Sequence, residues 1–230
     1  MKINMIYMAA GNSRRFGSNK LLYELEGKPM YRHLLERLLR ICGRHDGWRV
    51  FVVSQYGDLL SGVRELAENM PAERGETVIP VFCGESRNGA SYTVRAGLSA
   101  ACERAADMDF SESGSEPQIG RHAAAYVFFA SDQPYLSEKT AEEFLLFMER
   151  AGAELGCVTS GGETGNPVWF TEKYVPELME LTGDRGGKKV LKAHMDRAVF
   201  YEVADPGELC DLDEAPDMRE QGYSPGEKHN

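Results

Sequence analysis

The sequence has few cysteines, and they show no pairing pattern. Five cysteines are spread over 230 residues, an odd number with no Cys-x-x-Cys pair. A domain held together by disulfides has a denser, even set, so we expect buried free thiols in a reducing compartment. The five are Cys42, Cys83, Cys102, Cys157 and Cys210.

Positive charge and long apolar runs are also scarce. The formal net charge is −10, from 26 Lys and Arg against 36 Asp and Glu. A nucleic-acid binder shows a basic face and a polybasic membrane anchor needs a cluster of Lys and Arg, so both classes are excluded. The apolar run at residues 3–10 is too short to span a bilayer, and no signal peptide is visible. We expect a cytoplasmic protein with neither nucleic acid nor membrane as a partner.

Short apolar runs alternate with helical repeats along the chain. The helix signals include Pro29 before an i, i+4 apolar pattern and Ser137 as an N-cap. This alternation predicts an α/β fold of three layers, a mostly parallel sheet with helices on both faces. The predicted strands are 3–10, 49–54, 78–83, 123–130, 155–159, 168–170 and 199–203. The predicted helices are 30–41, 59–69, 90–106, 138–150, 188–194 and 215–221.

The length fits one domain, which we place at residues 1–222. Residues 107–121 hold Ser, Glu, Gly and Pro with few apolar residues, which predicts a variable surface loop or insert. Residues 223–230 are predicted to be a flexible tail. Ligands of such sheets bind at the carboxyl ends of the strands. The loops of interest therefore follow Ala9, Ser54, Cys83, Ala130 and Thr159.

The loop after the first strand has the composition of a phosphate-binding loop. Two glycines let backbone N–H groups approach an anion, and three cations stand in an otherwise acidic protein. A triphosphate needs both features, although a solvated surface loop would explain the same composition. The pattern is neither a Walker A loop nor Gly-x-Gly-x-x-Gly. The loop reads Ala9-Ala10-Gly11-Asn12-Ser13-Arg14-Arg15-Phe16-Gly17-Ser18-Asn19-Lys20-Leu21-Leu22.

A carboxylate follows the most apolar predicted strand. Asp132 stands in Ser131-Asp132-Gln133-Pro134, directly after residues 123–130. Mg²⁺ prefers oxygen ligands and keeps several waters, so one or two carboxylates suffice to hold it beside phosphates. Taken alone, an Asp before Pro also fits a turn residue.

Together these residues resemble the MobA-like NTP transferase family. The pattern Ala9-Ala10-Gly11-x-Ser13-x-Arg15-Phe16-Gly17-x-x-Lys20-Leu21-Leu22, followed by Gly27-Lys28-Pro29, resembles the opening signature of that family. Its Ala-Ala-Gly-x-Ser form is closer to the molybdenum cofactor cytidylyltransferase branch than to the guanylyltransferase branch, which reads Leu-Ala-Gly-Gly. The resemblance covers residues 5–218 and implies a nucleotide-diphospho-sugar-transferase-like, Rossmann-like sheet.

The resemblance also implies roles for individual residues. The catalytic group would be Lys20, Arg15 and Asp132, with Asp132 in the family's metal-binding Asp-Gln-Pro. The segment 84–98 resembles one near the base and ribose, although Ser91 or Ser86 would equally fit the N-cap of the following helix. The nucleotide-binding set would be Ala9, Ala10, Gly11, Ser13, Arg14, Arg15, Lys20 and Ser91.

Three later segments complete the resemblance. Asn166 and Pro167 fall in Gly-Asn-Pro-Val-Trp-Phe, which resembles an acceptor-facing Gly-His-Pro-Val-Leu-Phe, with Asn in place of His. Asp213 falls in a partial match to a closing Asp-x-Asp-Thr-Pro motif, where it is either a second metal ligand or a helix cap. Residues 183–188 resemble Gly-Asp-x-Gly-Ala-Arg, in which Asp184 would cap the next helix. A role of this segment in binding the acceptor is left open.

The implied activity is transfer of CMP from CTP to the phosphate of the molybdenum cofactor (molybdopterin), with release of pyrophosphate. Mg²⁺, or Mn²⁺, would be the cofactor, and a xanthine-dehydrogenase-like hydroxylase the client of the product. The alternatives are a GTP-dependent enzyme, a sugar- or polyol-phosphate nucleotidyltransferase, and a non-catalytic accessory protein that binds the cofactor for a molybdenum hydroxylase.

Overall fold

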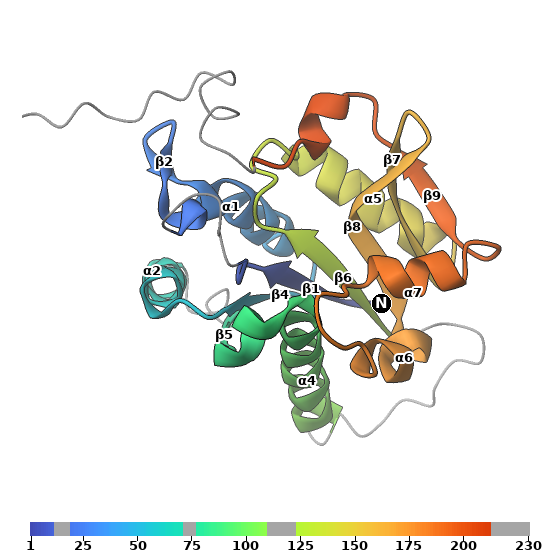
Figure 1. The fold of residues 1–230 in the computed structure, drawn as a ribbon, viewed down its shortest axis with the longest axis horizontal. Coiled ribbons are helices and arrows are strands. Elements are labelled where there is room, and N and C mark those ends of the chain that lie inside the picture. Colours follow the sequence, from blue (N-terminus) through green and yellow to red (C-terminus); the bar gives the residue numbers. More distant parts are fainter. Residues whose placement is uncertain (12–18, 71–76, 110–122, 213–230) are drawn as a thin grey trace, which may run out of the picture.

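The computed structural model of the chain describes residues 1–11, 19–70, 77–109 and 123–212, without the side chains of 105–109. Seven strands form one sheet in the order β5-β4-β1-β6-β8-β7-β9 (Figure 1). Strand β8 runs antiparallel to both its neighbours, and every other neighbouring pair is parallel. The predicted mostly parallel α/β sheet is confirmed. The strands are β1 (Lys2–Met8), β4 (Trp48–Ser54), β5 (Val78–Phe82), β6 (Ala124–Ala130), β7 (Leu155–Ser160), β8 (Glu163–Thr171) and β9 (Val199–Glu202).

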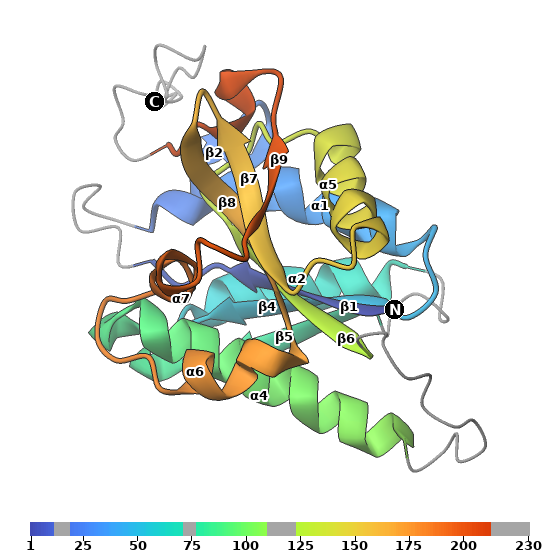
Figure 2. The same cartoon turned by 90° about the vertical axis from the view of Figure 1, so that its right-hand side faces the viewer.

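Helices cover both faces of the sheet, as Figure 2 shows edge-on. One face is covered by α1 (Met30–Cys42), α2 (Gly57–Glu68) and α5 (Glu138–Arg150). The other is covered by α4 (Ala90–Asp109), α6 (Val175–Met179) and α7 (Lys188–Ala193). Across the described residues, no helix has both the length and the apolar character that crossing a bilayer requires.

Strand β1 shows why two apolar layers form. Successive side chains of a strand point to opposite faces. Ile3, Met5 and Tyr7 therefore join the core under α1 and α5, while Ile6 joins the core under α4. Gly97 of α4 lets that helix approach, because a Cβ there would lie 2.5 Å from the Ile6 side chain.

Most predicted elements are present, within a few residues of their expected ends. Ser137 caps α5 as predicted, since its hydroxyl accepts from the Thr140 N–H at 3.1 Å. The strand expected at 168–170 is longer and forms the nine residues of β8. Helix α6 and the two-residue strands β2 (Glu24–Leu25) and β3 (Lys28–Pro29) are not predicted by the sequence pattern. The helix expected at 215–221 lies outside the described residues.

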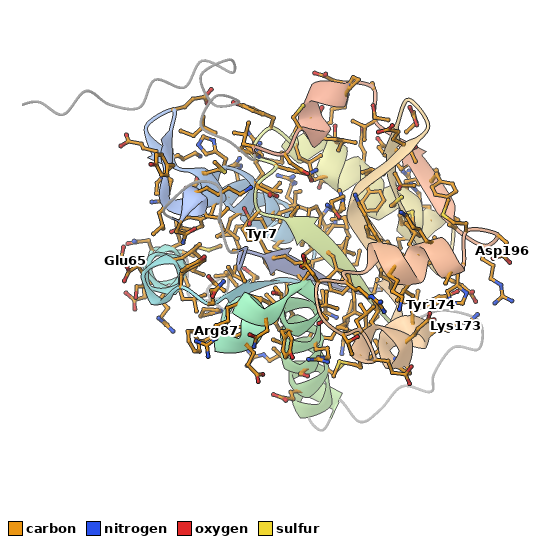
Figure 3. The ribbon with its side chains drawn as sticks, viewed as in Figure 1. Tyr7, Glu65, Arg87, Lys173, Tyr174 and Asp196 are labelled. Atoms are coloured by element: carbon orange, nitrogen blue, oxygen red, sulfur yellow. The ribbon has the colours of Figure 1, made fainter. Side chains whose placement is uncertain are left out.

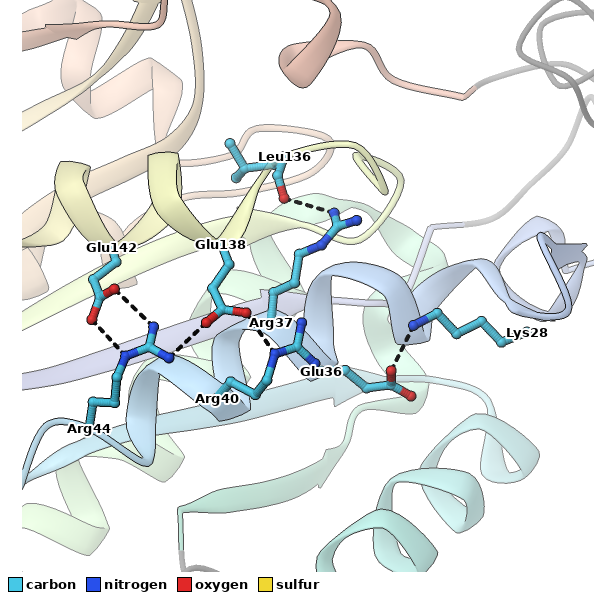
Figure 4. Close-up of polar contacts among 8 residues, drawn as sticks. All are labelled: Lys28, Glu36, Arg37, Arg40, Arg44, Leu136, Glu138 and Glu142. Atoms are coloured by element: carbon cyan, nitrogen blue, oxygen red, sulfur yellow. Dashed lines mark hydrogen bonds and ion pairs between the residues drawn. The ribbon is translucent and has the colours of Figure 1, made fainter.

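An ion-pair ladder joins α1 to α5 on the surface (Figure 4). The Arg44 guanidinium lies 2.7 Å from Glu138 Oε1 and 2.9 Å from Glu142 Oε2. Arg40 Nε lies 2.6 Å from Glu138 Oε2. Both arginine side chains are about half exposed, so the ladder faces solvent.

Candidate active site

A cavity of about 380 Å³ opens at the carboxyl ends of β1 and β6. The loops after β1, β5 and β6 all contribute to its wall, as the parallel topology predicts. No residue of the turn after β7 lines it, and the amino-terminal half of β8 does so instead. The polar and glycine residues of the wall are Gly11, Lys20, Ser86, Gly89, Thr93, Ser131, Asp132, Asn166, Asp184, Gly186, Gly187, Lys188 and Asp211.

Lys20 and Asp132 meet inside this cavity. The Lys20 ammonium lies 2.9 Å from Asp132 Oδ2, although the residues are 112 positions apart in sequence. Lys20 is only 8% exposed and also donates to the Leu212 carbonyl at 3.1 Å. It begins the 3₁₀ turn Lys20–Leu22, which Asn19 caps by accepting from the Leu21 N–H. Burial makes a lone ammonium costly, so Lys20 needs the anionic partner that the cavity supplies.

The turn that carries Asp132 is anchored from beneath. Tyr7 is fully buried at the centre of the molecule (Figure 3), and its hydroxyl donates to the Tyr31 carbonyl at 2.7 Å and lies 3.4 Å from the Ser131 carbonyl. Burial, reinforced by the charge of Asp132, raises the pKa of Tyr7 well above its usual value. The phenol therefore stays protonated and remains a donor. The Ser131 hydroxyl also donates to the Met8 carbonyl at 2.8 Å, which ties the end of β6 to β1.

The same turn is held from two further sides. Arg37 of α1 donates to the carbonyls of Pro134 and Leu136, the latter at 2.9 Å (Figure 4). On the other side, the Leu212 N–H donates to the Asp132 carbonyl at 2.9 Å, and Gln133 Nε2 donates to the Leu209 carbonyl at 3.0 Å. These backbone contacts fix the direction of the Asp132 side chain.

The start of the loop after β1 is held by the end of β4. Gln55 donates to the Ala10 carbonyl at 2.7 Å, and the Tyr56 hydroxyl donates to the Gly11 carbonyl at 2.8 Å. Both carbonyl oxygens therefore accept hydrogen bonds from the protein. Because these bonds offset their partial negative charge, the carbonyls repel a phosphate in the cavity less strongly.

The amino end of α4 meets the segment 183–184 at the cavity wall. Gly89 has φ +140°, and a Cβ there would collide with the backbone of Gly183. Asp184 Oδ1 accepts from the Ala90 N–H at 3.3 Å. The predictions that Ser86 or Ser91 caps α4 and that Asp184 caps the next helix are therefore wrong. Ser91 lies inside α4, and Asp184 binds the first turn of α4 across a 94-residue separation in sequence.

The side of the cavity next to β8 carries an amide and a second lysine. Asn166 stands in β8, is joined to Pro167 by a cis peptide bond, and lines the wall. Lys188, the first residue of α7, lines it too, with its ammonium 3.4 Å from the Thr164 carbonyl. Asp211 lies on the wall one residue before the Leu212 that holds Lys20 and Asp132.

The structure brings part of the predicted site together. Ala10, Gly11, Lys20, Asp132 and Asn166 share one cavity, while their chemical roles stay predictions. Three other predicted residues do not reach the wall, and four lie outside the described residues. Those off the wall are Ala9 and Ser91, both fully buried, and Pro167. Those outside the description are Ser13, Arg14, Arg15 and Asp213.

The sequence leaves an acceptor role open for residues 183–188, but it does not place Asp184, Lys188 or Asp211 in the wall. The Gly-rich run at 183–188 signalled a close backbone approach, and Asp211 stands two residues before Asp213. Neither signal gave a direction for the side chains.

The donor set fits a hard divalent ion. Among the described residues, no group of three or more His, Cys, Asp and Glu could hold a metal ion. Asp132 and Asp211 nevertheless line the same cavity. Mg²⁺ is held by one or two carboxylates together with waters and substrate phosphates, so this set is sufficient.

Known proteins with similar sequences include a purine catabolism protein and a probable molybdenum cofactor guanylyltransferase. The purine catabolism protein PucB of Bacillus subtilis is 24% identical over 209 residues, which cover 90% of each chain. A probable molybdenum cofactor guanylyltransferase of Pyrococcus horikoshii is 50% identical over 38 residues, which are 16% of this chain and 20% of that one.

Solved structures share the fold at low sequence identity. Rv0371c of Mycobacterium tuberculosis has a TM-score of 0.63 at 22% identity, covering 96% of this chain and 98% of that one. A complex of Rv0371c with manganese has a TM-score of 0.60 at 21% identity, covering 96% and 97%.

The family model for the MobA-like NTP transferase domain matches residues 5–198. That range contains the β1 loop, Lys20, Asp132, Asn166 and Lys188, and hence most of the cavity wall. The chain therefore belongs to the MobA-like NTP transferase family and is a nucleotidyltransferase.

Proposed function

We propose that the protein transfers CMP from CTP to the terminal phosphate of molybdopterin, the organic part of the molybdenum cofactor, and releases pyrophosphate. The observation that carries this proposal is the 2.9 Å approach of Lys20 to Asp132 in a cavity at the carboxyl ends of β1 and β6. A buried cation and a carboxylate at one point suit a substrate that brings both a triphosphate and a divalent ion. The choice of CTP rests on the Ala9-Ala10-Gly11-x-Ser13 form of the loop.

The reaction needs little acid–base chemistry from the protein. An oxygen of the acceptor phosphate attacks the α-phosphorus of CTP, and the bond from that phosphorus to the bridging oxygen breaks, so that pyrophosphate leaves. A phosphomonoester has its second pKa at about 6, so it is mostly dianionic at neutral pH and needs no general base. Positioning and charge neutralisation are the remaining tasks.

The chain's own groups suit those two tasks. The Lys20 ammonium would bind the phosphates and offset the charge that develops on the transferred group. Arg15, from the same loop, is proposed to act beside it. Gly11 would bring the backbone close to the triphosphate. The anchored turn would keep the Asp132 carboxylate at a fixed place in the wall.

Asp132 and Asp211 would hold Mg²⁺ or Mn²⁺, with Asp213 as a third proposed ligand. When bound, the ion would offset the negative charge of the substrate phosphates.

A GTP-dependent reaction is the second candidate. It is favoured by the 50% identity to a probable guanylyltransferase over a 38-residue segment. The similarity that covers 90% of the chain is instead to PucB, a purine catabolism protein. Xanthine is a purine, so that name supports a xanthine-dehydrogenase-like hydroxylase as the client of the product.

The test is to incubate the protein with Mg²⁺, molybdenum cofactor and each of the four NTPs in turn. Released pyrophosphate is measured, and the product is identified by mass. We expect the cytosine dinucleotide form of the cofactor. Turnover with GTP at least tenfold faster than with CTP would overturn the choice of base. Cofactor binding without pyrophosphate release from any NTP would instead indicate a non-catalytic accessory protein.

A further inference from the structure

Lys188 is a cation of the cavity that the proposed reaction has not yet used. It is partly buried and lines the wall together with Asn166, Gly186 and Gly187. Among the described residues, its ammonium has one hydrogen-bond contact, a long one of 3.4 Å to the Thr164 carbonyl. That distance lies beyond the usual range for a strong N–H···O bond.

Several lysines of the protein have carboxylate partners in ion-pair range. Lys28 lies 2.7 Å from Glu36, and Lys173 lies 2.7 Å from Glu154 beside Tyr174 (Figure 3). Within the described part of the chain, Lys188 has no carboxylate in ion-pair range. This protein carries ten more negative than positive charges, so a partly buried lysine left without one is unexpected. A partly buried ammonium in a polar cavity is suited to an anion from outside.

The backbone around Lys188 fixes its place. A Cβ on Gly187 would lie 3.0 Å from the Phe170 ring, so this glycine lets the chain lie against β8. Lys188 therefore starts α7 directly over the strand that carries Thr164 and Asn166. Lys20 enters the same cavity from the β1 side, and β6 with Asp132 lies between β1 and β8 in the sheet. The cavity thus has one lysine on each side of Asp132.

We propose that Lys188, together with the Asn166 amide, binds the phosphate of the acceptor, while Lys20 serves the phosphates of the NTP. This inference rests on the proposed function and adds a separate anion site for the attacking group. The attacking phosphate and the NTP are both anions, and their approach is opposed by charge repulsion. A cation for each of them lowers that repulsion and holds the attacking oxygen in place.

Inorganic phosphate is the probe for the site itself. It is titrated into the full-length protein by calorimetry, for the wild type, Lys188→Met, Lys188→Arg and Lys20→Ala. Lys189→Met is the matched control, because Lys189 is exposed and lines a different, smaller cavity with Glu177 and Glu180. Hydrogen bonds to charged groups predict a loss of about 10- to 100-fold in phosphate affinity for Lys188→Met. Lys188→Arg and Lys189→Met should stay within about threefold of the wild type, and Lys20→Ala should keep one phosphate site.

Two results of this titration would overturn the inference. One is phosphate binding by Lys188→Met as tight as that of the wild type. The other is a wild type that binds no phosphate up to about 50 mM. Circular dichroism of each variant shows whether the fold is kept, and Lys188→Arg tests the site with the charge in place.

Steady-state kinetics then separate the acceptor from the NTP. Lys188→Met should raise the KM for the cofactor about tenfold or more and leave the KM for CTP within about twofold. A raised KM for CTP with an unchanged KM for the acceptor would assign Lys188 to the nucleotide and refute the inference. If the wild type forms no nucleotide product with any NTP, the proposed function fails, while the phosphate titration still decides whether Lys188 binds an anion.

Discussion

Two groups of ion pairs in this protein use the same chemistry in different surroundings. The Lys20–Asp132 pair lies in a cavity, with the lysine 8% exposed and the partners joined to Leu212. The Arg40 and Arg44 ladder lies on the surface between α1 and α5, with arginine side chains 55% and 45% exposed. Water and salt screen the ladder, whereas the cavity pair acts at short range with little screening. We therefore expect the Lys20–Asp132 pair to serve function and the Arg40 and Arg44 ladder to serve stability alone.

The largest expected effect is on catalysis, from the cavity pair. Lys20→Ala should lower kcat at least about 100-fold, the range observed when one preorganised stabilising group is removed. The free energy of unfolding should change by no more than about 1 kcal/mol, because Asp132 is partly open to solvent. Pyrophosphate release and thermal unfolding measure the two quantities. Lys28→Ala is the control, since Lys28 pairs with Glu36 on the surface at 2.7 Å. Equal turnover in Lys20→Ala and the wild type would remove the distinction between the two groups.

The next effect concerns the other member of the pair. Asp132→Asn keeps the shape of the side chain and loses its charge, so a divalent ion loses one anionic ligand. We expect the Mg²⁺ or Mn²⁺ concentration at half-maximal activity to rise about tenfold or more. Asp196→Asn is the control, because Asp196 lies exposed at the molecule's edge (Figure 3). An unchanged metal requirement would show that Asp132 does not bind the ion.

Arg37 belongs to α1, like Arg40 of the ladder, but its side chain points to the turn after Asp132. It donates to the carbonyls of Pro134 and Leu136 in the turn after Asp132. Arg37→Met should lower kcat about tenfold and destabilise the fold by about 1–2 kcal/mol, because two carbonyls lose a charged donor. Its effect passes through Asp132, so it should also raise the metal requirement, which a purely structural loss would leave unchanged. Arg40→Met should change neither kcat nor the metal requirement, and Arg37→Lys should restore part of the activity. A metal requirement that stays at the wild-type value in Arg37→Met would make Arg37 a structural residue only.

Much of the fold was predictable because its signals are local. Strands such as β6, with the apolar run Ala124–Ala130, and helices such as α5, with its Ser137 cap, are recognisable within a few residues. Strands β2 and β3 have two residues each and α6 has five, too short to show a period. The order of the strands and the antiparallel direction of β8 depend on packing between distant segments, which no local pattern records.

The site divides in the same way. Lys20 and Asp132 follow parallel strands. The rule that ligands bind at the carboxyl ends of such strands therefore predicts both as site residues. Lys188 and Asp184 follow β8, which is antiparallel, and the same rule does not cover them. The two glycines around Asp184 were visible in sequence, but that Asp184 binds the first turn of α4 depends on two segments 94 residues apart.

The surface ladder should affect stability and leave turnover unchanged. Arg44→Ala removes contacts to both Glu138 and Glu142 and should cost about 0.5–1 kcal/mol of unfolding free energy. The loss of unfolding free energy should shrink as the salt concentration rises from about 0.05 M to about 0.5 M, because salt screens exposed ion pairs. Denaturant unfolding at several salt concentrations measures it, with kcat as the second readout. A fall in kcat of tenfold would show that the ladder is coupled to the cavity.

The smallest effect is the pH dependence of that ladder. Hydrogen bonds from Arg44, against partial desolvation, hold the pKa of Glu142 below its usual value, with His45 as a further donor. A lowered folded pKa means stability that is fully present above the unfolded pKa of about 4.3 and is lost as pH falls through the folded value. Glu142→Gln should therefore be less stable than the wild type at pH 6 by a few tenths of a kcal/mol, and the gap should close on acidification below about pH 4. Unfolding curves of both proteins from about pH 3 to about pH 7 measure this difference in stability. A gap that widens on acidification would mean that Glu142 is protonated more readily in the fold than in the unfolded chain, which would contradict the contacts that Arg44 makes.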